Sequence, residues 1–498
     1  MNALLYAGLA ATLLVIVSLS IWSGSRAKKN AKNSMGVVAG VITGSLVGGS
    51  STIGTAQLAY QFGMSAWWYT LGAGISCLIL ALVYTKSLRR TGCASLVGII
   101  GKEYGPKVGM AVSVLSSVGT FINVIPQVIS ATAVLAVVFP ALGLTASVII
   151  SVVFMVLYVI FGGTKGAGIV GIVKMILIYI TMIVGAAMVL TMVGGVPAFT
   201  AMARNIPDPN GVRFTSLFAR GVGTDIGACL SVLLGVVTTQ TYAQGVLSGR
   251  TDKDGVGGAV ISAFLLLPIG IGGIMIGLYM RANAALYAGV TAKTALTAFV
   301  TAHMPPLVAG IILGTLFITV VGTGAGITLG ISTMLTNDIL GKLSSRFRQP
   351  RAKSILSKVM IVLVLAVAGI LACGSLGDII LQFTFMSMGL RGAVVFVPLS
   401  CALWLPGRIR TPYTMASVII GPLVVLLFGL WKVLPFDPLF AGVGVSLLIM
   451  AVGFTRQNTS VSSYPPSLYS KTSTTAAKYA GIVLVFYSIF LFTVPCRR

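Results

Sequence analysis

The stretch GSLVGGSSTIG, residues 44–54, lies in the middle of an apolar run that extends over residues 36–60. It is much richer in glycine and hydroxyl side chains than the residues on either side of it. Small residues of this kind let two transmembrane helices pack closely. They also suit a helix that breaks inside the membrane, where irregular backbone is tolerated only if it is buried in protein or faces a cavity. The density of both residue types favours the broken helix.

The composition indicates a membrane protein. The chain has 498 residues, of which 57% are apolar and 8% are charged; an ordinary soluble protein is about 25% charged. This excludes a soluble globular enzyme, a disordered chain and a secreted domain held by disulfides. The net charge of +25 comes from short basic clusters between apolar runs, so we expect no nucleic-acid partner. A single histidine excludes a histidine-based metal centre or hydrolase, and we expect neither an enzyme nor an organic cofactor.

Apolar runs long enough to cross a hydrocarbon core of ~30 Å recur along the chain. They predict an all-α polytopic protein with about 14 transmembrane helices, at residues 3–23, 36–60, 65–85, 108–140, 143–161, 168–193, 222–247, 256–280, 307–337, 356–373, 378–404, 413–433, 436–454 and 479–495. With the N-terminus outside, the inner loops hold 23 Lys and Arg residues and the outer loops hold 8. This bias predicts that orientation, in a plasma membrane or a bacterial inner membrane.

Three later spans carry polar residues at membrane depth. Residues 238–244, TTQTYAQ, predict a second interrupted helix, and two such helices indicate an inverted-repeat transporter with a binding site at the bilayer midplane. Residues 319–328 read either as part of a sodium site or as a Gly/Thr packing seam. In span 108–140 a polar stripe on one helical face either lines a permeation path or forms interhelical hydrogen bonds. That stripe consists of Ser116, Ser117, Thr120, Asn123 and Gln127.

At these residues the chain resembles the sodium:solute symporter family. The resemblance covers roughly residues 30–450. Its motifs are GSLVGGSSTIG followed by GMSAWW, then GGTKG, TTQTYAQ followed by SGR, and GTGAGITLGISTMLTNDIL. It implies a core of five plus five helices, with inverted repeats at 36–193 and 222–404 whose first helices are broken. An outer loop at 194–221 joins them, and segments 1–35 and 405–498 are peripheral.

The resemblance also implies a sodium site. The carbonyl ligands fall on Gly44, Val47 and Thr319, and the two hydroxyl positions fall on Gly322 and Thr323. Thr323 fits this pattern. Gly322 departs from it, because family members commonly carry a hydroxyl there.

Lys174 is a second departure from the family. Many members carry an aspartate on the fifth core helix, whereas this chain reads Gly171-Ile-Val-Lys174. In some proton-coupled amino-acid carriers of this architecture, a lysine on that helix places its ammonium where sodium would lie. Three interpretations stay open for Lys174: it extends to the inner interface, it replaces sodium or couples protons, or it lies beside a working sodium site.

Arg391 is the other charge inside a span. Because an intramembrane arginine usually faces a cavity or a partner, it pairs with a solute carboxylate, with Asp225, or with a structural group. By position in the repeats, the expected solute contacts are Ser50, Ser51, Gln57, Ser117, Thr120, Asn123, Thr239 and Gln240. The expected function is sodium-coupled symport of a small organic solute by alternating access, leaning towards a carboxylate-bearing one. The alternative is a proton-coupled or sodium-independent transporter with Lys174 in place of sodium.

Overall fold

The computed structural model describes residues 3–26, 32–162, 167–207, 211–287, 289–336, 349–374, 380–431 and 437–455. Within these ranges all regular structure is helical, apart from two single β-bridges, Asn33–Gly249 and Ile409–Phe454. The predicted span at 479–495 lies outside them.

The helices follow the chain in this order: α1 (Ala3–Arg26), α2 (Met35–Leu46), η1 (Ser50–Gly54), α3 (Thr55–Phe62), η2 (Gly63–Ala66), α4 (Trp67–Ile79), η3 (Leu80–Tyr84), α5 (Thr85–Arg90), α6 (Leu96–Tyr104), α7 (Pro106–Ile122), α8 (Val124–Val138), α9 (Leu144–Gly162), α10 (Ala167–Val193), α11 (Val196–Arg204), α12 (Val222–Thr238), α13 (Gln240–Leu247), α14 (Asp252–Ala282), η4 (Ala284–Leu286), η5 (Ala292–Thr294), α15 (Ala295–His303), α16 (Pro306–Met334), α18 (Pro350–Cys373), α19 (Ile380–Trp404), α20 (Thr411–Trp431) and α21 (Pro438–Val452).

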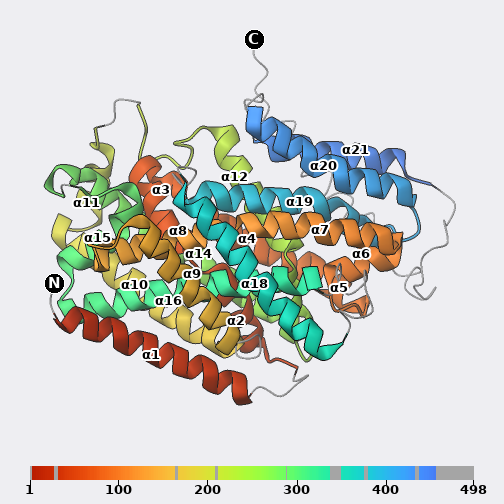
Figure 1. Ribbon diagram of the computed structural model, residues 1–498. Helices are drawn as coiled ribbons and strands as arrows, with labels where there is room; N and C mark the ends of the chain where they lie inside the picture. Colours follow the sequence, from red (N-terminus) through yellow and green to blue (C-terminus); the bar gives the residue numbers. More distant parts are fainter. Residues whose placement is uncertain are drawn as a thin grey trace, which may run out of the picture.

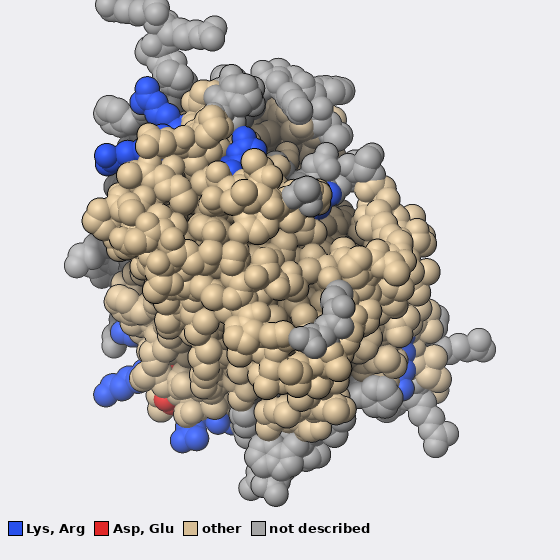
Figure 2. All heavy atoms as spheres, turned by 90° about the vertical axis from the view of Figure 1, so that its left-hand side faces the viewer, with Lys and Arg blue, Asp and Glu red and all other residues tan. Residues whose placement is uncertain are grey.

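The long helices form one bundle and run mostly along a common direction, with α11, α15 and the N-terminus at one end (Figure 1). In the described residues, 8 helices are long and apolar enough to cross a membrane, or up to 9 if the bent pair α12 and α13 is one span. Large apolar side chains such as Leu14, Ile183 and Ile370 are exposed on the outside of the bundle, as contact with lipid requires. Figure 2 shows the end of the bundle that holds α11 and α15, where Lys and Arg gather towards the rim. The prediction of an all-helical, multi-pass membrane protein is confirmed.

The first predicted break is present between α2 and η1. The helix α2 ends at Leu46, and Val47 adopts an extended conformation with φ −85° and ψ 108°. The chain then resumes as the π-helical turn η1 and continues into α3. Glycines at 48 and 49 allow this break to be buried, because a Cβ at Gly49 would lie 2.2 Å from Oγ of Ser130 on α8. The backbone groups released at the break therefore lie inside the protein rather than in lipid.

The second break separates α12 from α13. Thr239 between them is extended, with φ −86° and ψ 123°, and the two helices meet at an angle of 51°. The predicted interruption within TTQTYAQ is therefore present. It falls after Thr238, so Gln240 begins the next helix.

A backbone bridge joins the segments that adjoin the two breaks. The amide of Asn33, just before α2, donates to the carbonyl of Ser248, just after α13, at 2.8 Å. The amide of Arg250 returns a bond to the Asn33 carbonyl at 3.0 Å. Arg89 on α5 adds its Nη1, which lies 3.0 to 3.2 Å from the carbonyl oxygens of Val246, Leu247 and Gly249. We call these contacts the end clip.

Glycine contacts set the distance between α2 and α10. A Cβ added to Gly171 on α10 would lie 2.1 Å from the carbonyl oxygen of Gly40, and one added to Gly44 would lie 2.6 Å from Cα of Gly171. The two backbones therefore touch, as in close small-residue packing of transmembrane helices. Lys174 follows Gly171 by three residues and lies on the same side of α10.

Candidate functional site

The predicted sodium ligands come together at the first break. Thr323 on α16 lies with its Oγ1 3.0 Å from the carbonyl oxygen of Val47 and 3.0 Å from that of Thr319. The hydroxyl therefore connects α16 to the extended residue that ends α2. Gly44 lies about one turn before Val47 on α2. Its carbonyl oxygen belongs to the same group, because one ammonium, that of Lys174, contacts both this oxygen and Oγ1 of Thr323.

The Lys174 ammonium lies among these oxygens. Its Nζ donates to the carbonyl of Gly44 and to Oγ1 of Thr323, both at 3.2 Å, and the side chain is only 4% exposed. Of the three interpretations of Lys174, this geometry agrees with an ammonium at the predicted sodium position. The side chain crosses from α10 to α2 and α16 instead of extending to the helix end.

Gly322 provides room for the ammonium. A Cβ added there would lie 3.5 Å from Nζ of Lys174 and 3.3 Å from Oη of Tyr158 on α9. A serine or threonine at this position would place its hydroxyl in the space beside the ammonium. The missing hydroxyl at 322 and the lysine at 174 thus fit each other. Tyr158 was not predicted, because it lies in an ordinary apolar run that no local pattern marks.

A polar network holds the residues that follow the first break, Gly49 and Ser50. Gln127 on α8 accepts a bond from the amide of Gly49 at 2.9 Å, and its Nε2 lies 3.5 Å from Oγ of Ser50. Ser50 also bonds Thr384 on α19 at 2.7 Å and contacts the Tyr69 hydroxyl. Ser51 instead bonds locally, to the backbone of Gly48.

A second buried basic side chain, that of Arg391, lies at the second break. Arg391 on α19 is 2% exposed. Its Nη1 donates to Oγ1 of Thr239 at 2.8 Å, and its Nε donates to the carbonyl of Ser387 at 3.2 Å. Thr384 and Arg391 are about two helical turns apart, so they share one face of α19. This face therefore contacts both breaks.

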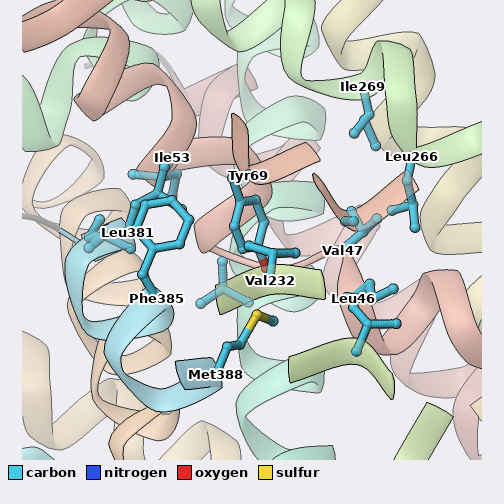
Figure 3. Close-up of a cluster of buried hydrophobic side chains, with 14 of the residues drawn as sticks. Leu46, Val47, Ile53, Tyr69, Val232, Leu266, Ile269, Leu381, Phe385 and Met388 are labelled. Carbon is cyan, nitrogen blue, oxygen red and sulfur yellow. The ribbon is translucent and has the colours of Figure 1, made fainter. Parts of the chain in front are cut away.

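Apolar side chains from several helices converge between the breaks. Figure 3 shows Tyr69, Phe385, Met388, Val47 and Val232 facing one another. The rings of Tyr69 and Phe385 pack at a centroid distance of 6.0 Å. This apolar cluster borders the polar groups at Ser50 and Arg391.

Asp225 is paired with Arg220 and not with Arg391. The Nε of Arg220 lies 2.8 Å from Oδ1 of the fully buried Asp225, and Ser65 donates to the same oxygen at 2.6 Å. The Arg220 guanidinium lies over the Phe385 ring, 5.4 Å from its centroid. The Arg220–Asp225 pair therefore borders the apolar cluster at Phe385.

The other predicted solute contacts have different surroundings. Gln57 accepts a bond from the amide of Ile380 at the start of α19, and Gln240 accepts one from the amide of Leu96 at the start of α6, both at 2.9 Å. Ser117 and Thr120 on α7 bond carbonyls one turn back on their own helix. Asn123 is buried where α7 meets α8.

The sodium:solute symporter family model matches residues 30–421. This chain belongs to that family. Membership of this family indicates a transporter and not an enzyme. A curated relative, the high-affinity choline transporter 1 of Caenorhabditis elegans, is 24% identical over 257 residues, which cover 48% of this chain and 43% of the relative. The match thus spans less than half of the relative's length.

Two solved structures share the fold. A Na⁺-coupled sialic acid symporter in its substrate-bound, outward-open state aligns with a TM-score of 0.73 at 17% identity, over 91% of this chain and 97% of the other. The nucleobase-cation-symport-1 family transporter Mhp1, closed around bromovinylhydantoin, aligns with a TM-score of 0.53 at 11% identity, over 89% and 99%. The predicted family is confirmed, and the family supports sodium as a coupling ion.

Proposed function

We propose that this protein is a secondary active transporter of a small organic solute in which the Lys174 ammonium takes the place of a sodium ion. The proposal includes alternating access, about 14 transmembrane helices, two inverted repeats of five helices, and an outside N-terminus. The two breaks and the family support this architecture.

One observation supports the proposal that the Lys174 ammonium takes the place of sodium. Its ammonium donates to two of the oxygens predicted to bind sodium, and Gly322 leaves it the space. An ammonium and a sodium ion carry the same charge, and they cannot share one set of oxygens a few ångströms apart without strong repulsion. The lysine therefore competes directly with sodium for this position.

The coupling step then involves a proton on Lys174. The charged ammonium ties α10 to α2 and α16 through charge-assisted bonds. Loss of the proton removes those bonds and lets the three helices separate. A solute that binds one arrangement more tightly is linked to this proton with equal strength in both directions.

Sodium-coupled symport is the second candidate. Membership of the family favours it, as does the convergence of oxygens from Gly44, Val47, Thr319 and Thr323. In this candidate Lys174 withdraws from the oxygens when sodium binds, and the site works without a hydroxyl at 322.

Thermal unfolding of the purified, full-length protein separates the two candidates. The protein would be heated in NaCl, KCl and choline chloride between about pH 5.5 and 8.5, because a ligand that binds only the folded state raises the unfolding temperature. We expect no sodium-specific rise in the wild type. We expect one in the double variant Lys174→Ala/Gly322→Ser, which removes the ammonium and restores the hydroxyl.

Lys86→Ala is the matched control, since Lys86 is an exposed lysine of α5. It should unfold as the wild type does in all three salts. A sodium-specific rise in the wild type that is lost in Thr323→Ala would overturn the lysine proposal and establish the second candidate.

A further inference from the structure

Two of the three guanidinium nitrogens of Arg391 are hydrogen-bonded, and the third is not. Nε and Nη1 are bonded to Ser387 and Thr239, whereas Nη2 is buried and has no hydrogen-bond partner in the described part of the chain. Gly119 on α7 makes room for this side chain, because a Cβ there would lie 2.9 Å from Cγ of Arg391. The guanidinium is thus held in place while its Nη2 amino group has no partner.

No described carboxylate neutralises this guanidinium. The chain has 8 acidic residues, of which Asp208, Asp338 and Asp378 lie outside the described residues. The other five have partners elsewhere: Glu103 accepts from the amide of Gly407, Asp225 pairs with Arg220, Asp252 pairs with Arg89, Asp254 bonds Thr251, and Asp437 accepts from the amide of Leu439. Placing an arginine at membrane depth is costly, and the usual compensation is a partner of opposite charge.

The groups around Arg391 indicate what else such a partner contains. Tyr69 and Tyr242 both lie close enough to interact electrostatically with its charge. Beyond them lie the apolar side chains of Phe385, Met388 and Val232 (Figure 3). A sugar needs many hydrogen-bonding partners, and this surface offers few. A cation such as a quaternary ammonium would be repelled by the guanidinium.

We infer that the solute is a small monocarboxylate whose carboxylate binds Nη2 of Arg391 and whose apolar body packs against Tyr69, Phe385 and Met388. The inference rests on the proposed solute transport and names its substrate class. The Thr239 hydroxyl accepts from Nη1 and donates its own hydrogen to the carbonyl of Gly235, so it holds Nη1 in place and leaves Nη2 as the group that binds the carboxylate.

The test uses the purified full-length protein and probes of matched shape. Propionate, 3-methylbutanoate and phenylacetate are compared with their neutral amides and with choline at constant chloride, once with N-methylglucamine and once with sodium as the counter-ion. We expect at least one carboxylate to raise the unfolding temperature in a saturable way, and its amide and choline to leave it unchanged. No rise with any carboxylate, or a rise with choline or an amide alone, overturns the inference.

Two substitutions assign the effect to the guanidinium. Arg391→Met should weaken binding of the effective carboxylate by roughly 30-fold or more, since it removes a buried charged partner. Arg391→Lys keeps the charge, so a partial loss is expected there even if the methionine variant does not fold. Arg408→Met, the same change at an exposed position, should bind as the wild type does. Equal binding by the Arg391 and Arg408 variants refutes the inference.

Failure here is distinct from failure of the proposed function. The Lys174 proposal is judged by the effect of sodium without any solute, and the Arg391 inference is judged by the effect of carboxylates at a fixed cation, with and without sodium. If both sodium and a carboxylate raise the unfolding temperature, the Lys174 proposal is wrong and the Arg391 inference stands.

Discussion

Replacing Gly171 with alanine tests the packing that brings Lys174 to the first break. The added Cβ would lie 2.1 Å from the carbonyl oxygen of Gly40 and 3.3 Å from Cα of Gly44, all on backbone. Because backbone atoms cannot rotate away, α2 and α10 must separate by about 1 Å, and overpacking of this kind costs up to about 3 kcal/mol. The same separation lengthens the 3.2 Å bond between Lys174 and the Gly44 carbonyl.

The assay is thermal unfolding of the purified variant in sodium-free buffer. Gly326→Ala is the control, because a Cβ at Gly326 on α16 meets nothing within 4 Å. It should unfold at or slightly above the wild-type temperature, since alanine favours a helix by roughly 1 kcal/mol over glycine. If Gly171→Ala and Gly326→Ala unfold at the same temperature, the contact between α2 and α10 does not hold the site together.

Two further predictions concern the Arg220–Asp225 pair and His303. Arg220→Met leaves the carboxylate of Asp225 buried and uncompensated, so it should destabilise the fold by about 3–5 kcal/mol, and Arg220→Met/Asp225→Leu should recover most of the loss of unfolding temperature. Burial lowers the pKa of His303 from its ordinary value, so the unfolded chain binds this proton more readily than the folded one. Stability should therefore fall as the pH drops below about 6.5, and the fall should be smaller in His303→Gln, whereas identical pH profiles would contradict the argument.

Much of the fold could be predicted from the composition of single spans. Glycine and hydroxyl residues at 44–54 and the polar string at 238–244 marked both interruptions, and each coincides with an extended residue, Val47 and Thr239. The described part of each of the first thirteen predicted spans falls on a helix or a broken helix. These features are local, since they depend on residues that adjoin one another in the chain.

The site depended on contacts between helices, which sequence spacing does not fix. Three interpretations of Lys174 stayed open because its reach depends on the close approach of α2 and α10 at Gly44 and Gly171. The surroundings of Gln240 depended on the residue at which the second break falls. The break falls after Thr238, so Gln240 begins α13 and its side chain contacts the start of α6.

The end clip has a consequence for how the two breaks move. Asn33 and Ser248 join the N-terminal end of α2 to the C-terminal end of α13, and the opposite ends of these two helices stop at the extended residues Val47 and Thr239. If either helix turned at its break, the backbone hydrogen bonds of the end clip would carry the movement to the other helix. We therefore expect the Lys174 position at one break and the Arg391 position at the other to move together.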